Sequence, residues 1–323
     1  MATTALLPAR PVSIDALPAC ERDSLTAWLN LYMGLEAGAN ADNTIAAKTR
    51  DLRAFLGFFA EATGCDQADL WTRSITSDFL KTLQRDRRSP TTINRILATL
   101  RHCAAWIHRQ RPFLAGNPME RITDIAVDDP EWKGLEDIEV TRLKAAAEQL
   151  IHLKRRRNQQ PIRDYAIFHV LLRTGLRVSE LLRLDLDQYQ VKHLVNVKRK
   201  GRKVSRQVFL AADAREALDR YIEEVRGCEA GPLLRSRSGK RLARQNVDAA
   251  LKAIANQANA RFPNDQKIKL HAHVLRHTCL RKVAEKHGVQ YAMELSGQSS
   301  ERYIWRYVQP SSAQKEAALD DLF

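Results

Sequence analysis

The residues best suited to chemistry lie in the last fifth of the chain, between His271 and Tyr307. Within the segment HAHVLRHTCL, Arg276 stands between His273 and His277, and Tyr307 follows thirty residues after His277. A guanidinium can hold two non-bridging phosphate oxygens, a histidine can donate or exchange a proton, and a tyrosine hydroxyl can attack phosphorus. The combination predicts phosphoryl transfer through a protein hydroxyl.

A zinc site is the competing interpretation of this segment, because His271, His273, His277 and Cys279 are all possible ligands. Arg276 in their midst would repel a cation, and no CxxC or second HxxxH pair completes a tetrahedral set. We therefore expect neither a metal nor another cofactor in this protein.

The nucleophile has two candidates, Tyr303 and Tyr307, which are four residues apart and would share one face of a helix. Their spacing alone does not choose between them. A tyrosine without charged neighbours is more often structural than catalytic. The catalytic interpretation therefore depends on Arg276 and His273, and on a further arginine earlier in the chain.

That further arginine is Arg177, which follows Thr174–Gly175–Leu176 at the expected junction of two helices. A tight glycine turn before a helix start exposes a side chain where anions are favoured. A surface arginine paired with Glu180 is the alternative interpretation of the same residues. Both interpretations stay open at the level of this motif.

A basic hairpin is the only convincing β signal in the sequence. HLVNV and VSRQVFL flank the turn KRKGRK, which predicts two strands with Gly201 at the tip. Six basic residues lie between Lys198 and Arg206, which argues against a merely solvated turn and favours a ribbon that enters a groove or reaches a phosphate. Lys200, beside the glycine, could offer its ammonium to a leaving oxygen. The other DNA contacts expected on this hairpin are Lys198, Arg199 and Arg202.

Composition supports a polyanionic partner. The 52 Lys and Arg residues against 38 Asp and Glu residues give a net charge of +14. No run of 18 apolar residues occurs, so a membrane partner is disfavoured. The five cysteines are odd in number, far apart and free of CxxC motifs, as in reduced cytosolic proteins, and no signal peptide is evident. We expect a cytoplasmic protein of a bacterium.

Four helical segments between residues 21 and 118 predict a compact DNA-binding domain, after a loose leader over residues 1–20. In the fourth segment, SPTTINRILATLRHCAAWIHRQ, Ser89 is the expected cap and Pro90 the first helical residue. Other starts are predicted near Asn43 and at Thr76 or Ser77. A helix N-terminus favours a phosphate, although charges on a helix face are otherwise simply solvated. The phosphate contacts expected here are Thr91, Thr92, Asn94 and Arg95.

The second half predicts a mixed α/β domain over residues 136–310, after a linker over residues 119–135 and before a tail over residues 311–323. Its helices are expected at residues 135–153, 214–225, 243–259, 273–286, 289–295 and 301–308, with others beginning at Pro161 and after Arg177. The chain as a whole is therefore predicted to be mainly α, with one small antiparallel sheet.

These pieces, in this order, resemble the tyrosine recombinase (phage integrase) family. The similarity lies in TGLRVSELLRL, a basic hairpin with KG, HVLRHT, and SGQSS with a tyrosine nine residues after its glutamine. SPTTINRILATLRHCAAW followed by NP is similar to the family's core-binding domain, so the resemblance spans most of residues 25–310. It implies a four-helix core-binding domain and a catalytic domain that together clamp double-stranded DNA.

The resemblance also implies which residues are catalytic. They are Arg177, Lys200, His273, Arg276, Gln298 and Tyr307. The nine-residue spacing after Gln298 selects Tyr307 over Tyr303. Two positions depart from the family pattern. The family's GKG is RKG here, which keeps Lys198 and Lys203 as alternatives to Lys200, and Gln298 stands where the family has His or Trp. A glutamine can donate a hydrogen bond to a phosphate oxygen but carries neither a titratable proton nor a charge.

The implied reaction needs no cofactor. Tyr307 attacks a DNA phosphorus, displaces the 5′-oxygen and leaves a 3′-phosphotyrosine, which a 5′-hydroxyl of a partner duplex then attacks. Four protomers on two DNA sites are implied, with the tail after Pro310 docking on a neighbour or, alternatively, on its own domain. Integration, excision or resolution of a mobile element would use this chemistry. The alternatives are a monomeric topoisomerase of type IB character and a non-catalytic DNA-binding protein, for which Gln298 would be a sign of decay.

Overall fold

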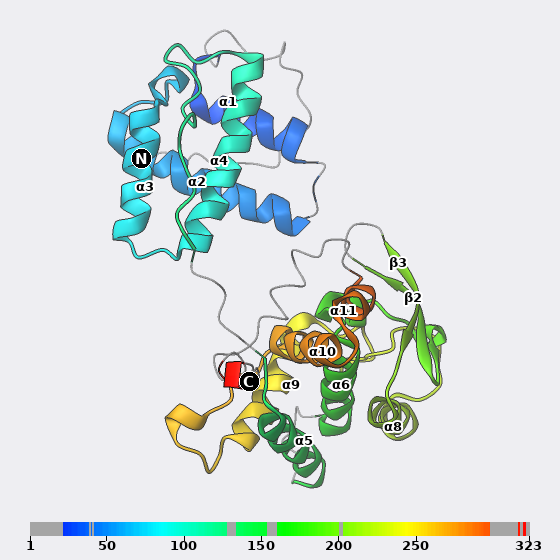
Figure 1. Ribbon diagram of the computed structural model, residues 1–323. Helices are drawn as coiled ribbons and strands as arrows, with labels where there is room; N and C mark the ends of the chain where they lie inside the picture. The colour runs from blue at the N-terminus through cyan, green and yellow to red at the C-terminus, as the bar shows by residue number, and fades with distance from the viewer. Residues whose placement is uncertain are drawn as a thin grey trace. The chain divides into compact units, whose positions relative to one another are not determined.

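The computed structural model describes residues 22–38, 40, 42–127, 134–153, 160–199, 203–297, 316 and 319–320. The chain divides into two compact units, Met1–Asp129 and Pro130–Phe323 (Figure 1). Each unit has its own hydrophobic core. The division falls inside the segment that the sequence predicts as a linker. The prediction of a mainly helical chain with one small antiparallel sheet is confirmed.

The first unit is built from helices whose apolar residues recur every three or four positions and therefore form one buried stripe. The helices are α1 (Leu25–Leu31), which continues as a wider turn over Tyr32–Ala37, α2 (Asp42–Thr63), α3 (Arg73–Arg85) and α4 (Pro90–Gln110). Aromatic side chains fill the centre. The ring of Phe55 lies 4.7 Å from that of Trp71 and 5.3 Å from that of Phe79, measured between centroids.

The helix starts of this unit follow their caps. Ser89 caps α4 as predicted, because its hydroxyl accepts a hydrogen bond from a backbone amide in the first turn. The expected cap of α3 at Thr76 or Ser77 is wrong, since Thr72 caps the helix four residues earlier. Thr76 is instead buried within α3, where its hydroxyl accepts a hydrogen bond of 3.0 Å from the indole of Trp71.

The segment after α4 differs from the predicted linker. Met119 is buried in the core of the first unit, and Ile122 and Ile125 pack against that core. The side-chain amide of Asn94 donates to the carbonyl of Ile125 and accepts from its backbone amide, both at 2.8 Å. Residues 119–125 therefore belong to the first unit, because apolar side chains at this spacing cover its surface.

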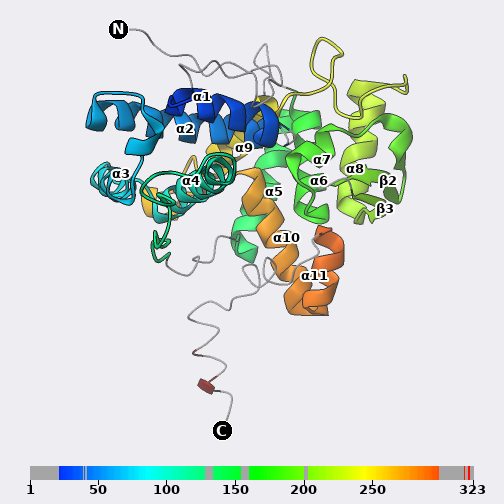
Figure 2. The same ribbon diagram turned by 90° about the horizontal axis from the view of Figure 1, so that it is seen from above.

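The second unit surrounds one central helix. Its helices are α5 (Asp137–His152), α6 (Pro161–Thr174), α7 (Val178–Leu182), α8 (Ala212–Tyr221), α9 (Arg244–Ala258), α10 (Ala272–His287) and α11 (Val289–Ser296). Each of these begins within two residues of its predicted start, and the helix expected at residues 301–308 lies outside the described residues. Helix α6 packs against α5, α8, α9 and α10 (Figure 2). This position explains its nearly continuous apolar run, because a helix covered on all sides has no polar face.

The predicted hairpin is confirmed as part of a three-stranded antiparallel sheet in the order β1 (Tyr189–Gln190), β2 (His193–Lys198) and β3 (Val204–Phe209). The register pairs Lys198 with Val204, and the amide of Arg199 donates to the carbonyl of Lys203 at 2.7 Å. Strand β1 was not predicted, because two residues are too short to show an alternating pattern. No helix in the described ranges is both long and apolar enough to cross a membrane.

Candidate active site

The turn between α6 and α7 lets a second helix approach closely. Gly175 ends α6 with φ of +60°, a left-handed conformation that glycine adopts without strain. A Cβ atom here would lie 3.4 Å from the sulfur of Cys279 and 3.5 Å from a methyl group of Leu280, both on α10. Helix α10 therefore packs directly on the turn that leads to Arg177, and the left-handed conformation of this turn is what favours glycine.

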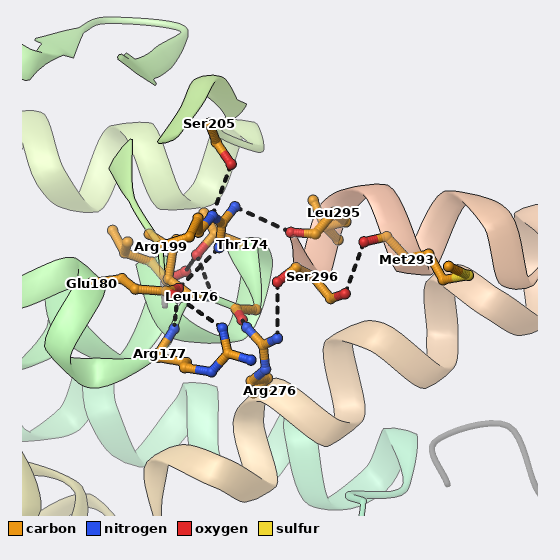
Figure 3. Close-up of polar contacts among 12 residues, drawn as sticks. Thr174, Leu176, Arg177, Glu180, Arg199, Ser205, Arg276, Met293, Leu295 and Ser296 are labelled. Carbon is orange, nitrogen blue, oxygen red and sulfur yellow. Dashed lines mark hydrogen bonds and ion pairs between the residues drawn. The ribbon is translucent and has the colours of Figure 1, made fainter. Parts of the chain in front are cut away.

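Arg276 of α10 joins three parts of the second unit. Its side chain is only 3% exposed. One terminal nitrogen, Nη1, donates to the carbonyl of Gly175, and Nη2 donates to the carbonyl of Ser296 at 3.1 Å. The guanidinium is thereby fixed between the end of α6 and the end of α11 (Figure 3).

Arg177 lies beside Arg276 in Figure 3, and the charges of both arginines act on the pKa of His273. Its Nη1 donates to Oε1 of Glu180 at 2.8 Å, and its backbone amide donates to Oε2 of the same carboxylate at 2.9 Å. The side chain of Arg177 is 24% exposed. The pairing with Glu180 and the convergence with a second arginine, which the sequence left as alternatives, thus occur together.

Glu180 is 2% exposed, and its charge state follows from its neighbours. Burial alone would raise the pKa of this carboxyl, but hydrogen bonds from Arg177 and the charges of Arg199 and Arg177 outweigh it and leave the pKa below its ordinary value. Glu180 is therefore ionised at neutral pH. The sequence offered it only as a surface partner, although a glutamate three residues after a helix cap commonly bonds back to that cap.

His273 lies one turn before Arg276 on α10 and within the field of both arginines. Its pKa is lowered below 6.5, mainly by burial and then by the positive charges of His271, Arg244, Arg276 and Arg177. A lowered pKa keeps the imidazole neutral at pH 7, where one ring nitrogen can accept a proton. Two arginines and a neutral histidine therefore meet at one place in the second unit.

The structure corrects the prediction for Arg199. The sequence predicts a DNA contact, but the side chain is buried, with 4% exposed. The guanidinium donates to Glu180, to the hydroxyl of Ser205 and to the carbonyl of Leu295. All three bonds are internal to the unit, so we no longer expect Arg199 to bind a phosphate. Its neighbour Lys198 is exposed at the end of β2.

Several predicted site residues lie outside the described parts of the chain. They are Lys200, Arg202, Gln298, Tyr303 and Tyr307. Two of these residues, Lys200 and Gln298, directly follow described residues that contact each other. A Cβ atom on Gly297 would lie 3.4 Å from Cγ and Cδ of Arg199. The residue before Lys200 therefore touches the residue before Gln298.

The predicted phosphate contacts of the first unit have mixed surroundings. Thr91 is exposed at the start of α4, and the hydroxyl of Thr92 accepts from Ser89 at 2.8 Å. Asn94 bonds to the backbone of Ile125. The predicted contact at Arg95 competes with an internal one, because its guanidinium pairs with a carboxylate that is 1% exposed. DNA contacts at these four positions stay predictions.

Metal-binding clusters do not occur in the described ranges, where no group of three or more His, Cys, Asp and Glu side chains could hold an ion. Cys279, one of the residues considered as a ligand, faces the turn at Gly175 instead. Burial raises the pKa of its thiol to about 11. This side chain therefore serves packing between α10 and the turn.

Two family profiles match the sequence. The one described as "Phage integrase family" matches residues 135–314, more than half of the chain. The one described as "Phage integrase, N-terminal SAM-like domain" matches residues 29–111. The first match covers the unit that holds the arginine cluster, and the second lies within the helical unit.

Among curated proteins, the tyrosine recombinase XerD of Listeria monocytogenes serotype 4b (strain F2365) is 27% identical over 256 residues, which cover 76% of this chain and 80% of that protein. XerD of Bifidobacterium longum (strain NCC 2705) is 27% identical over 308 residues, covering 89% and 94%. XerC of Neisseria meningitidis serogroup B (strain ATCC BAA-335 / MC58) is 26% identical over 282 residues, covering 86% and 89%.

Solved structures show the same fold. The XerH site-specific recombinase superposes with a TM-score of 0.70 at 17% identity, covering 91% of this chain and 82% of that one. The Tn1549 transposon integrase superposes with a TM-score of 0.69 at 15% identity, covering 93% and 100%. The chain thus belongs to the phage integrase family, and it is a site-specific recombinase of the tyrosine recombinase type.

Proposed function

We propose that this chain cleaves and rejoins double-stranded DNA through a 3′-phosphotyrosine at Tyr307, in the integration, excision or resolution of a mobile element. The observation that supports this most directly is the convergence of Arg177 and Arg276. They come from segments about a hundred residues apart, and Gly175 brings them together beside a neutral His273. Such a cluster suits the charge of a phosphoryl group in transfer.

The proposed cleavage step begins at the Tyr307 hydroxyl, whose ordinary pKa of about 10 makes it a weak nucleophile. His273, neutral at pH 7, accepts the phenolic proton as the oxygen attacks phosphorus. The bond from phosphorus to the 5′-oxygen breaks, and Lys200 protonates that oxygen. Rejoining runs in reverse, with a 5′-hydroxyl as the attacking group. The ester energy is retained in the phosphotyrosine, so no nucleotide is consumed.

The two arginines have different tasks in this scheme. A guanidinium carries five N–H donors in a planar fork. Arg177 has a single side-chain bond to Glu180 among the described residues, so its other donors can hold non-bridging phosphate oxygens. Arg276 is fixed by two backbone carbonyls and contributes its charge from a rigid position. Gln298 adds a neutral hydrogen bond.

DNA and oligomer assignments draw on the structural relatives. XerH was solved bound to a palindromic difH substrate in a post-cleavage complex, and the Tn1549 integrase with circular-intermediate DNA. We extend DNA binding to this chain, with Lys198, Arg202 and the start of α4 as contacts. We further propose a tetramer on two DNA sites, with the tail over residues 311–323 docking on a neighbouring protomer.

Covalent capture on mixed DNA sequences tests the proposal, because the adduct itself identifies the cleaved site. The chain is incubated with sheared host DNA and a randomised duplex library, denatured in SDS, and the attached DNA is sequenced. We expect a covalent adduct for the wild type and for Tyr303→Phe, and none for Tyr307→Phe, which should still bind DNA. DNA binding without any wild-type adduct would indicate the non-catalytic alternative. Relaxation of supercoiled plasmid without a preferred site would indicate the topoisomerase alternative.

A further inference from the structure

Arg199 makes three directional hydrogen bonds to three separate elements of the second unit. Its Nη1 donates to Oε2 of Glu180 on α7 at 2.9 Å. Its Nε donates to the hydroxyl of Ser205 on β3 at 2.9 Å. Its Nη2 donates to the carbonyl of Leu295 on α11 at 3.2 Å. The three bonds radiate from one guanidinium, as Figure 3 shows, and they use each of its nitrogens.

The ion pair between Arg199 and Glu180 is deeply buried, with 2% of each side chain exposed. A buried ion pair is a weak stabiliser, because removing two charges from water offsets most of their attraction. An apolar pair of similar volume would serve stability as well. The position of the pair suggests another purpose, since the same carboxylate also holds the side chain and backbone of Arg177.

The stem of Arg199 packs on the end of α11. Gly297, with φ of +64°, leaves room for it, since a Cβ there would lie 3.3 Å from Nε of Arg199 and 3.4 Å from its Cγ and Cδ. The residues that follow are Lys200 on one side and Gln298 on the other. Arg199 itself stands where the family's GKG has its first glycine, and Gln298 is the other departure from the family pattern, so Arg199 is one departure and contacts the residue before the other.

We propose that Arg199 is a positioning residue for DNA cleavage. It holds the hairpin that leads into Lys200, the carboxylate that orients Arg177 and the end of α11 in one arrangement. The inference rests on the proposed function, in which Lys200 protonates the leaving 5′-oxygen. The backbone of Arg199 also pairs with Lys203 across the hairpin, so loosening its side chain would loosen the chain on both sides of the turn that carries Lys200.

The main test compares Arg199→Met with a matched control, Arg163→Met. Arg163 is also buried, with 7% exposed, and donates to the carboxylate of Asp164 at 2.7 Å. It lies eleven residues before Thr174 on α6, roughly 16 Å away at 1.5 Å per residue. Both variants lose a buried guanidinium, but only one should loosen the site. Arg199→Lys keeps the charge without the three-way fork.

Three measurements are made on the full chain with a duplex recovered by covalent capture. We expect Arg199→Met to form the adduct about 100-fold more slowly in single turnover, the scale of an ångström-sized misplacement. Its Kd for the duplex should stay within about twofold, since the side chain of Arg199 is buried and bonded internally. Amide hydrogen exchange should accelerate in residues 203–209 and 289–297. Arg163→Met should show neither change, and Arg199→Lys should fall between.

A DNA duplex with a sulfur leaving group distinguishes misplacement of Lys200, the proposed general acid, from a general loss of activity. In a 5′-bridging phosphorothiolate the leaving group is a thiolate, which departs without protonation because its pKa is far below that of an alcohol. We expect the defect of Arg199→Met to shrink from about 100-fold to a few-fold on this duplex. The Arg163→Met control should behave like the wild type on both duplexes.

The outcomes are distinct. Wild-type rates in Arg199→Met or unchanged exchange in the two segments would overturn the positioning role, and a defect of equal size on the sulfur duplex would overturn its action through Lys200. A wild-type chain that forms no adduct at all would instead overturn the proposed function on which that role depends. Slow cleavage of the oxygen duplex by Arg199→Met, recovery of the rate on the sulfur duplex and unchanged affinity together support the positioning role.

Discussion

Glu180 shows how one buried carboxylate can organise two arginines. Its Oε1 accepts a hydrogen bond from Arg177 and its Oε2 accepts one from Arg199. The single negative charge of the carboxylate therefore balances only one of the two positive charges. The side chain of Arg177 is 24% exposed to solvent, whereas that of Arg199 is only 2% exposed. The net positive charge is thereby left on the residue that we propose to bind phosphate.

Replacement of Glu180 by Gln tests this arrangement. The amide keeps the shape but removes the charge, and Arg199 is left as a buried cation without its partner. We expect a loss of about 3–5 kcal/mol in the free energy of unfolding, the usual result of removing one partner from a buried pair. Urea denaturation followed by circular dichroism measures it. A loss below about 1 kcal/mol would mean that the pair is solvated.

His273 predicts the pH dependence of cleavage. Its pKa is lowered below 6.5, first by burial and then by the surrounding positive charges, so the neutral imidazole dominates at pH 7. As pH falls from 6.5 through the lowered pKa, the ring gains a proton and can no longer accept one. We expect the single-turnover rate to fall over that window. Stability contributed by the neutral ring is lost over the same window, because the unfolded chain protonates first.

A His273→Gln variant provides the control for this pH profile. Glutamine can donate a hydrogen bond but cannot titrate. The variant should cleave more slowly at pH 7 and should lack the fall on the acidic side. An unchanged acidic limb in His273→Gln would assign the titration to another group.

The turn between α6 and α7 is the element on which the site depends. Gly175→Ala would place a methyl group 3.4 Å from the Cys279 sulfur in a left-handed conformation. We expect a loss of stability of at least about 1–2 kcal/mol from backbone strain, together with slower cleavage as relaxation of the strained turn shifts Arg177. Differential scanning calorimetry and single-turnover cleavage would measure the two effects.

Gly64→Ala is the matched comparison for that experiment. Gly64 follows α2 with φ of +70°, but nothing lies within 4 Å of a Cβ built there. It should therefore show the strain without the steric contact and should cleave at the wild-type rate per folded molecule. Equal cleavage defects in the two variants would contradict a specific role for the α6–α7 turn.

At the scale of the whole molecule, the net charge of +14 governs encounter with DNA. Phosphate contacts release counterions, so affinity for a random duplex should fall steeply with salt. For about six or more contacts we expect roughly a 10³-fold loss between 50 and 200 mM salt. Fluorescence anisotropy of a labelled duplex would measure it, and Lys198→Met should make the slope shallower by about one. A salt-independent Kd would contradict an electrostatic interface.

Much of the architecture follows from local sequence. The cap at Ser89, the pairing of β2 with β3 and the helix starts of the second unit depend on residues within a few positions of one another. Such rules do not separate neighbouring candidates, which is why they favour Thr76 or Ser77 as the cap of α3 although Thr72 caps it. The motif order that resembles the family is likewise a property of sequence alone.

The tertiary structure decided which basic side chains are buried. Arg199 and Lys198 are adjacent in a uniformly basic turn, yet one is enclosed and the other exposed. The difference depends on acceptors that lie far away in sequence, such as the carbonyl of Leu295, 96 positions from Arg199. Similarly, Arg276 meets Gly175 across 101 positions. Burying a guanidinium is tolerable only where such acceptors converge, and local sequence does not encode that convergence.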